Sequence, residues 1–129
     1  MVDSFKHKGL RNKLVEELSN KGINDVKVLD AISKVPRHLF MNSSFIDHAY
    51  QDKAFPIGSG QTISQPFTVA YQTQLLEINK GDKILEIGTG SGYQAAVLCE
   101  MGAKVFTIER IRELYRKTSA FLPSINYFP

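Results

Sequence analysis

A glycine-rich segment carries the most specific chemical signal in this 129-residue chain. Residues 86–92 read EIGTGSG, and they lie between a short apolar run and a sequence that favours a helix. Glycine lets the backbone turn sharply and approach a ligand without a Cβ in the way. A helix N-terminus offers free N–H groups to an electron-rich partner. The segment is therefore a candidate ligand-binding loop at the C-terminal ends of parallel strands.

The glycine spacing separates two classes of cofactor. A dinucleotide fingerprint requires G-x-G-x-x-G, whereas here the third glycine comes one residue early and Tyr93 stands in its place. The pattern acid-x-G-x-G-x-G resembles the first motif of Rossmann-like S-adenosylmethionine methyltransferases. Glu109 ends the next apolar run, where a carboxylate accepts hydrogen bonds from both ribose hydroxyls. The alternatives are a tight turn without a ligand for the glycines and a solvated strand end for Glu109.

Further segments resemble one family within that class, the protein-L-isoaspartate O-methyltransferases. Residues 56–66, PIGSGQTISQP, followed by Val69-Ala70, resemble its signature segment, and residues 84–96 are similar to its first cofactor motif. Shorter matches to the family are VPRHLF at 35–40, YQD at 50–52, IER at 108–110 and Glu113-Leu114. The resemblance extends from about Leu10 to Tyr127.

The resemblance implies a repair reaction. Family members transfer a methyl group from S-adenosylmethionine to the free carboxylate of L-isoaspartyl residues, and of some D-aspartyl residues, in damaged proteins. The ester then collapses to a succinimide, which partly reopens as normal aspartate. A carboxylate is already ionised at pH 7, so such a protein carboxyl methyltransferase needs no strong base. It needs in-line positioning and exclusion of water.

The resemblance also assigns roles to individual residues. Ser64 matches the active-site serine, whose hydroxyl positions the substrate carboxylate, and Pro56 and Ile57 help to form a floor for an extended substrate peptide. The implied cofactor-binding residues are Gln61, Thr62 and Ile63 over the cofactor, Glu86, Gly88, Gly90 and Gly92 at its methionine end, and Glu109 with Arg110 at its ribose. The alternative role of Ser64 is that of an N-cap for the following helix, and the two roles are compatible.

Apolar periodicity and breakers predict the elements that hold these residues. We expect Leu75 and Leu76 to be buried, and the basic residues Lys6, Lys8, Arg11 and Lys13 to form a solvated helix face. Residues 52–66 are expected to form a long ordered loop or a short edge hairpin. The expected helices are 5–20, 24–35, a short piece at 43–50, 66–77, 91–101 and 111–122, the last stopped by Pro123, and the expected strands are 83–87 and 104–108.

Strand-helix-strand order predicts a parallel pair with a right-handed crossover. The expected fold class is α/β: a Rossmann-like S-adenosylmethionine-dependent methyltransferase fold with a helical N-terminal region and the C-terminal part of the sheet missing. Residues 1–80 would form the helical region carrying the substrate and active-site loop at 52–66. Residues 81–129 would form the first βαβα portion of the cofactor-binding domain.

Two strands alone should leave open edges and uncovered apolar surface. Three explanations stay open: part of a longer protein, a truncated gene, or two copies that associate through their open sheet edges. If the polypeptide ends at Pro129, we expect an inactive fragment with at most weak cofactor binding. A different methyltransferase and a dinucleotide enzyme on the same scaffold are further alternatives. The TISQP loop disfavours a different methyltransferase. The early third glycine disfavours a dinucleotide enzyme.

Composition excludes other classes. Sixteen basic and 13 acidic residues give a net charge of +3, too small without a cluster to predict nucleic-acid binding. No apolar run approaches the ~18 residues of a membrane span. Cys99 is the one cysteine, which favours a cytoplasmic location and an inert core thiol. His38 and His48 have no partners for a catalytic triad and no metal-ligand spacing, so we expect no metal and structural or surface roles for both.

Overall fold

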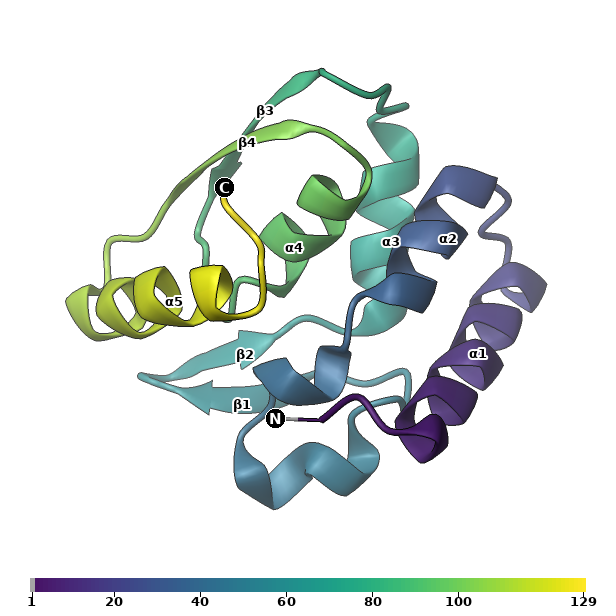
Figure 1. Ribbon diagram of the computed structural model, residues 1–129, viewed down its shortest axis with the longest axis horizontal. Coiled ribbons are helices and arrows are strands. Elements are labelled where there is room, and N and C mark those ends of the chain that lie inside the picture. Colours follow the sequence, from purple (N-terminus) through teal and green to yellow (C-terminus); the bar gives the residue numbers. More distant parts are fainter. Residues whose placement is uncertain (1) are drawn as a thin grey trace.

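The computed structural model describes residues 2–129. Figure 1 shows α4 at the centre, with α1, α2 and α3 on one side, α5 on the other and the β1–β2 hairpin beneath. The helices are α1 Phe5–Asn20, α2 Val26–Lys34, the 3₁₀ helices η1 Arg37–Phe40 and η2 Ser43–His48, α3 Pro66–Leu75, α4 Tyr93–Glu100 and α5 Arg112–Ser124. The strands are β1 Phe55–Gly58, β2 Gln61–Ile63, β3 Lys83–Ile87 and β4 Lys104–Ile108.

The first two helices form where their caps and apolar spacing predict. The Ser4 hydroxyl accepts a hydrogen bond from the His7 amide at 3.2 Å and begins α1. The Asp25 carboxylate accepts one from the Lys27 amide at 3.0 Å and begins α2. Capping side chains satisfy N–H groups that have no partner inside a helix. The predicted bounds of both helices are confirmed to within about two residues.

Three local predictions are wrong. Leu75 and Leu76 are 64% and 54% exposed, because they end α3 beyond its contacts with the core. Pro123 lies inside the last turn of α5, so the helix stops at Ser124, just past it. Arg11 is only 3% exposed and does not belong to the solvated face of α1.

Arg11 is buried because every part of its guanidinium group has a partner. It donates to the two Asp3 carboxylate oxygens at 3.0 and 2.8 Å, to the Ser33 carbonyl at 2.7 Å and to the Tyr50 hydroxyl at 2.8 Å. A buried charge is tolerated when it is paired and hydrogen-bonded. These bonds tie the residues before α1 to α2 and to the segment after η2.

The predicted parallel pair is confirmed. β3 and β4 pair in parallel from Lys83 opposite Lys104 to Ile87 opposite Ile108, and α4 connects them. On one face, Val105 packs with Ile78, Ala95 and Leu98 in a small buried cluster. The opposite face is bare, with side chains that are 53% to 74% exposed: Leu85, Ile87, Phe106 and Ile108. The expectation of uncovered apolar surface is therefore confirmed.

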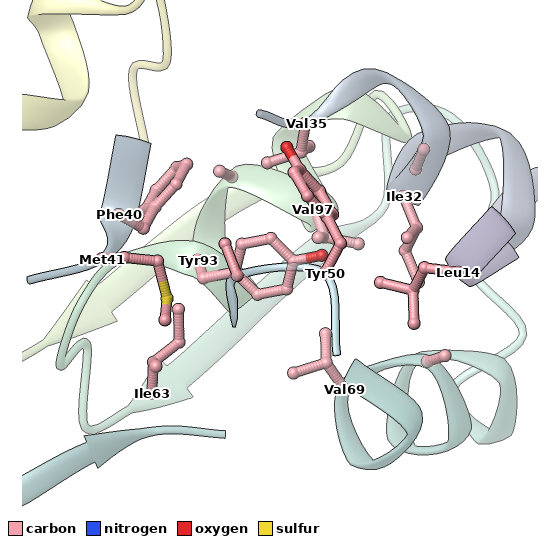
Figure 2. Close-up of a cluster of buried hydrophobic side chains, with 14 of the residues drawn as sticks. Leu14, Ile32, Val35, Phe40, Met41, Tyr50, Ile63, Val69, Tyr93 and Val97 are labelled. Atoms are coloured by element: carbon pink, nitrogen blue, oxygen red, sulfur yellow. The ribbon is translucent and has the colours of Figure 1, made fainter. Parts of the chain in front are cut away.

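The main hydrophobic core draws on both predicted regions of the chain. Figure 2 shows Leu14 and Ile32 from the first two helices facing Val69 of α3, with Tyr93 and Val97 of α4 beside them. All five side chains are at most 2% exposed. Regions 1–80 and 81–129 thus share one core, and their division into separate units stays a prediction. Within residues 2–129, no helix combines the length and apolar character needed to cross a membrane.

Candidate active site

The glycine loop lies at the C-terminal ends of the parallel strands, as predicted. Gly88 and Gly90 have φ values of 93° and 55°, in the left-handed region that glycine adopts without steric cost. The Gly88 and Thr89 amides both donate to the Ile108 carbonyl, at 2.7 and 3.1 Å. These bonds fasten the loop that follows β3 to the end of β4.

Glu109, the residue after β4, hydrogen-bonds to the glycine loop. One carboxylate oxygen accepts from the Gly90 amide at 2.8 Å and the other from the Ile111 amide at 2.9 Å. These two bonds, the one from Ile111 being the stronger influence, lower the pKa of the Glu109 carboxyl below its usual value. Each oxygen of a carboxylate has two acceptor sites, so both retain one for a ligand hydroxyl.

Glu86, near the end of β3, is partly buried and lies opposite Thr107 of β4. Its carboxylate accepts a hydrogen bond from the Thr107 hydroxyl at 2.7 Å. Burial raises the pKa of Glu86, and the negative charge of Glu109 adds to the rise, while the bond from Thr107 opposes it. The bond between Glu86 and Thr107 therefore links the adjacent ends of β3 and β4.

The segment 52–66 forms a hairpin, one of its two predicted forms. β1 and β2 pair antiparallel, with Phe55 opposite Ile63 and Pro56 opposite Thr62. Gly58, Ser59 and Gly60 all have positive φ values and make the turn. Ile63 is buried, whereas Gln61 and Thr62 are exposed.

Two adjoining cavities bring most of the predicted site residues together. A cavity of about 330 Å³ joins the hairpin residues Thr62, Ile63 and Ser64 to Glu86 and Gly88 of the glycine loop. A second, of about 200 Å³, joins Gln61 to Gly88, Glu109 and Arg110. Ile87 and Gly88 line both cavities. The two cavities therefore adjoin at the end of β3, between the hairpin and the strand ends.

Four predicted site residues lie elsewhere. Gly90 and Ile57 line a third, mostly apolar cavity of about 410 Å³ between η1, β1 and α5. Pro56 is exposed on β1 and lines none of these three cavities. Gly92 does not line them either, and a Cβ at this position would lie 2.9 Å from the Thr118 methyl group. The observed role of Gly92 is close packing of the loop against α5.

Ser64 is exposed, and its side chain does not cap α3. The N-cap of α3 is Gln65, which makes no side-chain capping bond. The Phe67 amide donates instead to Asp52, at 2.8 Å. The alternative role of Ser64 as the helix cap is therefore wrong, because Asp52, 15 positions before Phe67, accepts the amide hydrogen bond instead.

Among the polar residues of the 330 Å³ cavity that were not predicted, two form a hydrogen-bonded pair. Thr73 of α3 and Gln94 of α4 line it, and the Gln94 amide donates to the Thr73 hydroxyl at 2.9 Å. Both lie on helix faces that are otherwise apolar. A polar residue at a core position of an amphipathic pattern is the signal that could have identified them.

His38 and His48 have the expected structural and surface roles. His38 is buried and hydrogen-bonds to the Tyr50 hydroxyl at 2.8 Å and to the Val2 carbonyl at 3.0 Å, and His48 is exposed. Cys99 is partly buried, and burial raises the pKa of its thiol, so the reactive thiolate is disfavoured. From residue 2 onward, no three His, Cys, Asp or Glu side chains gather closely enough to hold a metal ion.

A parallel β–α–β unit, with a glycine loop at the strand ends and a carboxylate after the second strand, defines a Rossmann-like methyltransferase fold. A solved structure titled protein-L-isoaspartate O-methyltransferase matches 92% of the chain at a TM-score of 0.81 and 27% identity, over 39% of its own length. The family model for protein-L-isoaspartate(D-aspartate) O-methyltransferase matches residues 9–126. The chain therefore belongs to this family.

Curated relatives in the family are considerably more similar. The protein-L-isoaspartate O-methyltransferase of Christiangramia forsetii is 64% identical over 129 residues, and that of Flavobacterium johnsoniae is 67% identical over 129 residues. This chain covers 61% of each. A structure from Plasmodium falciparum, solved with S-adenosyl-L-homocysteine, shares the fold at a TM-score of 0.67 and 24% identity, over 95% of this chain and 60% of its own.

Proposed function

We propose that the chain transfers a methyl group from S-adenosylmethionine to the free carboxylate of isoaspartyl residues in damaged proteins. The observation that carries the proposal is that the cavity lined by Ser64 adjoins the cavity lined by Glu109, with Ile87 and Gly88 common to both. A carboxylate beside Ser64 would lie next to a cofactor held at the strand ends. The high identity to curated protein-L-isoaspartate O-methyltransferases supports the same reaction.

The residues at the strand ends suit this cofactor. An ideal Cβ at Gly88 would meet nothing within 4 Å, so the loop faces open space that a ligand can fill. Glu109 keeps one acceptor site on each oxygen for a ribose hydroxyl, with Arg110 beside it. Gln61, Thr62 and Ile63 would cover the cofactor from the hairpin. The P. falciparum relative was solved with the demethylated form of this cofactor.

For methyl transfer the protein mainly has to position the substrate carboxylate and the cofactor methyl group. The bound sulfonium supplies an already activated methyl group. Because the substrate carboxylate is ionised near pH 7, no residue has to remove a proton from it. The Ser64 hydroxyl donates a hydrogen bond to one carboxylate oxygen and leaves the other free for in-line attack. The hairpin excludes water, and Ile57 with Pro56 would support the peptide on either side.

A second reading is favoured by the bare sheet face. Leu85, Ile87, Phe106 and Ile108 are all more than half exposed, and among residues 2–129 β3 and β4 pair only with each other. Soluble monomers rarely leave such a contiguous apolar patch uncovered. On this reading the 129-residue chain binds the cofactor weakly and transfers no methyl group.

One paired experiment separates the two readings. S-adenosylhomocysteine is titrated into the chain by calorimetry, and methyl transfer is measured on an isoaspartyl peptide and on its normal aspartyl twin. The proposed function requires binding together with transfer to the isoaspartyl peptide alone. Equal transfer to both peptides, or no transfer at all, contradicts it, and weak binding without transfer supports the second reading.

The cellular location and the self-association of the chain are proposed as well. We propose a cytoplasmic location, supported by a single cysteine that leaves no intrachain disulfide possible. Self-association through the bare face and open edges is the expected behaviour if no other partner covers them. Sedimentation velocity tests it: Phe106→Lys should shift a dimer toward monomer, and an unchanged distribution would contradict an interface on this face.

A further inference from the structure

We propose that Arg37 and Asp52 are positioning residues that hold Ser64 against the glycine-loop helix. The proposal rests on the proposed function for the role of Ser64 itself. Neither residue lines the two cavities that meet at Gly88, so neither is placed to touch substrate or cofactor. Both come from the short family-like motifs, 35–40 and 50–52, to which the reaction assigns no role.

Arg37 connects three separate backbone segments. Its side chain is completely buried. It donates to the Ala49 carbonyl at 2.9 Å, to the Lys53 carbonyl at 3.2 Å and to the Ser64 carbonyl at 3.0 Å. A charged donor makes stronger hydrogen bonds than a neutral one. Arg37 therefore ties the backbone of Ser64 to both ends of the segment that leads into the hairpin.

The same guanidinium group contacts the glycine-loop helix. Its Cζ atom lies 4.7 Å from the centroid of the Tyr93 ring, a distance at which the ring face attracts a cation. Tyr93 is the first residue of α4, directly after Gly92, and Figure 2 shows it within the core between Met41 and Tyr50. One side chain thus contacts the first residue of the cofactor-side helix and the backbone of the candidate catalytic serine.

Asp52 holds the other side of Ser64. One carboxylate oxygen accepts the Phe67 amide at 2.8 Å, and the other accepts from the Lys21 ammonium group at 2.6 Å. Only 3% of this carboxylate side chain is exposed. Burial would raise the pKa of Asp52, but the bonds from Lys21 and Phe67 outweigh it and lower the pKa, so the capping group stays charged.

The two bonds bracket a short segment. Arg37 holds the carbonyl of Ser64, Asp52 holds the amide of Phe67, and between them Pro66 has a fixed φ and no amide hydrogen. An exposed serine at the end of a hairpin would otherwise sample several orientations. Fixing its backbone on both sides lowers the cost of holding the hydroxyl in the geometry that methyl transfer requires.

Amide hydrogen exchange of the full chain tests the Asp52 contact without any substrate. Asp52→Ala removes the acceptor, and the Phe67 amide should exchange on the order of tenfold faster, as expected for a lost cap. Asp52→Asn keeps an acceptor oxygen and should restore most of the protection. Val28→Ala is the matched control, because it weakens the buried core from helix α2 and removes no hydrogen bond of residues 64–67.

Arg37→Lys tests the other contact, because an ammonium group cannot reach three carbonyls in fixed geometry. We expect the carbonyl carbon-13 resonance of Ser64 to shift in this variant and to stay in place in Val28→Ala. With an active chain, Asp52→Ala should raise KM for the isoaspartyl peptide and lower kcat, while the Kd for S-adenosylhomocysteine stays within twofold. Asp52→Asn should recover both kinetic constants.

The outcomes are distinct from those of the proposed function. If the unmodified chain transfers no methyl group, the function fails, while the exchange and carbon-13 measurements still decide the positioning. The positioning proposal is overturned if Phe67 keeps its protection in Asp52→Ala. It is also overturned if Asp52→Ala and Val28→Ala speed exchange equally across the whole chain, since that pattern shows general destabilisation only.

Discussion

Substitution by alanine should mainly weaken ligand binding at Gly88 and mainly lower the stability of the fold at Gly92, although both glycines belong to the same loop. Gly88 has a φ of 93°, and a Cβ there would meet nothing within 4 Å. Gly92 has a φ of 85°, and its Cβ would lie 2.9 Å from Thr118 Cγ2 and 3.0 Å from Leu122 Cδ2. Gly88→Ala therefore adds a methyl group to the cavity, whereas Gly92→Ala adds one to the packed contact between the loop and α5.

The structure sets the size of each effect. Left-handed backbone costs a non-glycine residue roughly 1–2 kcal/mol, and both variants bear that cost. Gly92→Ala also overpacks a buried contact, which adds about 1–3 kcal/mol. The total for Gly92→Ala is about 2–5 kcal/mol, against a native stability of roughly 5–15 kcal/mol. A shift of the Thr118 side chain away from the new methyl group would also weaken the 2.7 Å hydrogen bond from its hydroxyl to the Gly90 carbonyl.

Urea unfolding followed by circular dichroism measures the stability of both variants, and calorimetry measures their affinity for S-adenosylhomocysteine. We expect Gly92→Ala to be the less stable by about 1–3 kcal/mol. We expect Gly88→Ala to lose the greater part of its affinity, because the new methyl group occupies ligand space. The reasoning is refuted if Gly88→Ala is the less stable of the two, or if it binds the ligand as tightly as the unmodified chain.

Three further predictions concern side chains outside the glycine loop. Ser64→Ala should abolish methyl transfer yet change the unfolding free energy by less than about 0.5 kcal/mol, because the side chain is exposed; a transfer assay and urea unfolding check it. Burial lowers the pKa of His38, so the unfolded state binds more protons and the unfolding free energy should fall as pH drops below about 6.5. Urea unfolding between pH 5 and 8 measures this slope, which His38→Gln should flatten. Arg11→Met should cost about 1–3 kcal/mol, because it leaves the Ser33 carbonyl and the buried Tyr50 hydroxyl without their donor, whereas Lys13→Met on the exposed side of α1 should cost almost nothing.

Each of these has a contradicting result. A loss of about 1 kcal/mol in the unfolding free energy of Ser64→Ala, as expected for a lost helix cap, would show that Ser64 caps α3 after all. An unchanged pH slope in His38→Gln would mean that other groups set the acid sensitivity. Equal stability of Arg11→Met and Lys13→Met would show that the Arg11 hydrogen bonds contribute nothing net.

Local signals in the sequence were sufficient for the parallel pair and its loop. Short apolar runs, three glycines in seven residues and an acid after the second run specify a strand–loop–helix–strand unit through near neighbours in the chain. The same holds for α1 and α2, whose caps are Ser4 and Asp25. These features depend on backbone conformation and on contacts a few residues apart, so one sequence is enough to predict them.

Contacts between distant residues account for the errors. Arg11 is buried because Tyr50, 39 positions later in the chain, and Asp3 both accept its hydrogen bonds. The cap of α3 comes from Asp52 rather than from the adjacent Ser64. Helical periodicity shows which face a side chain lies on, but it carries no information about which partner will lie opposite that face.

The sequence by itself determined the class of the loop, the family and the pairing of the two strands, since each of these follows from residue types at fixed spacing. Only the tertiary structure decided which glycine faces open cavity and which packs on α5, and which charged residues hold Ser64. Burial and hydrogen bonding are settled by the surroundings of a residue in space. At Gly88 and Gly92, four positions apart with the same left-handed backbone, those surroundings alone separate a ligand-facing position from a packing one.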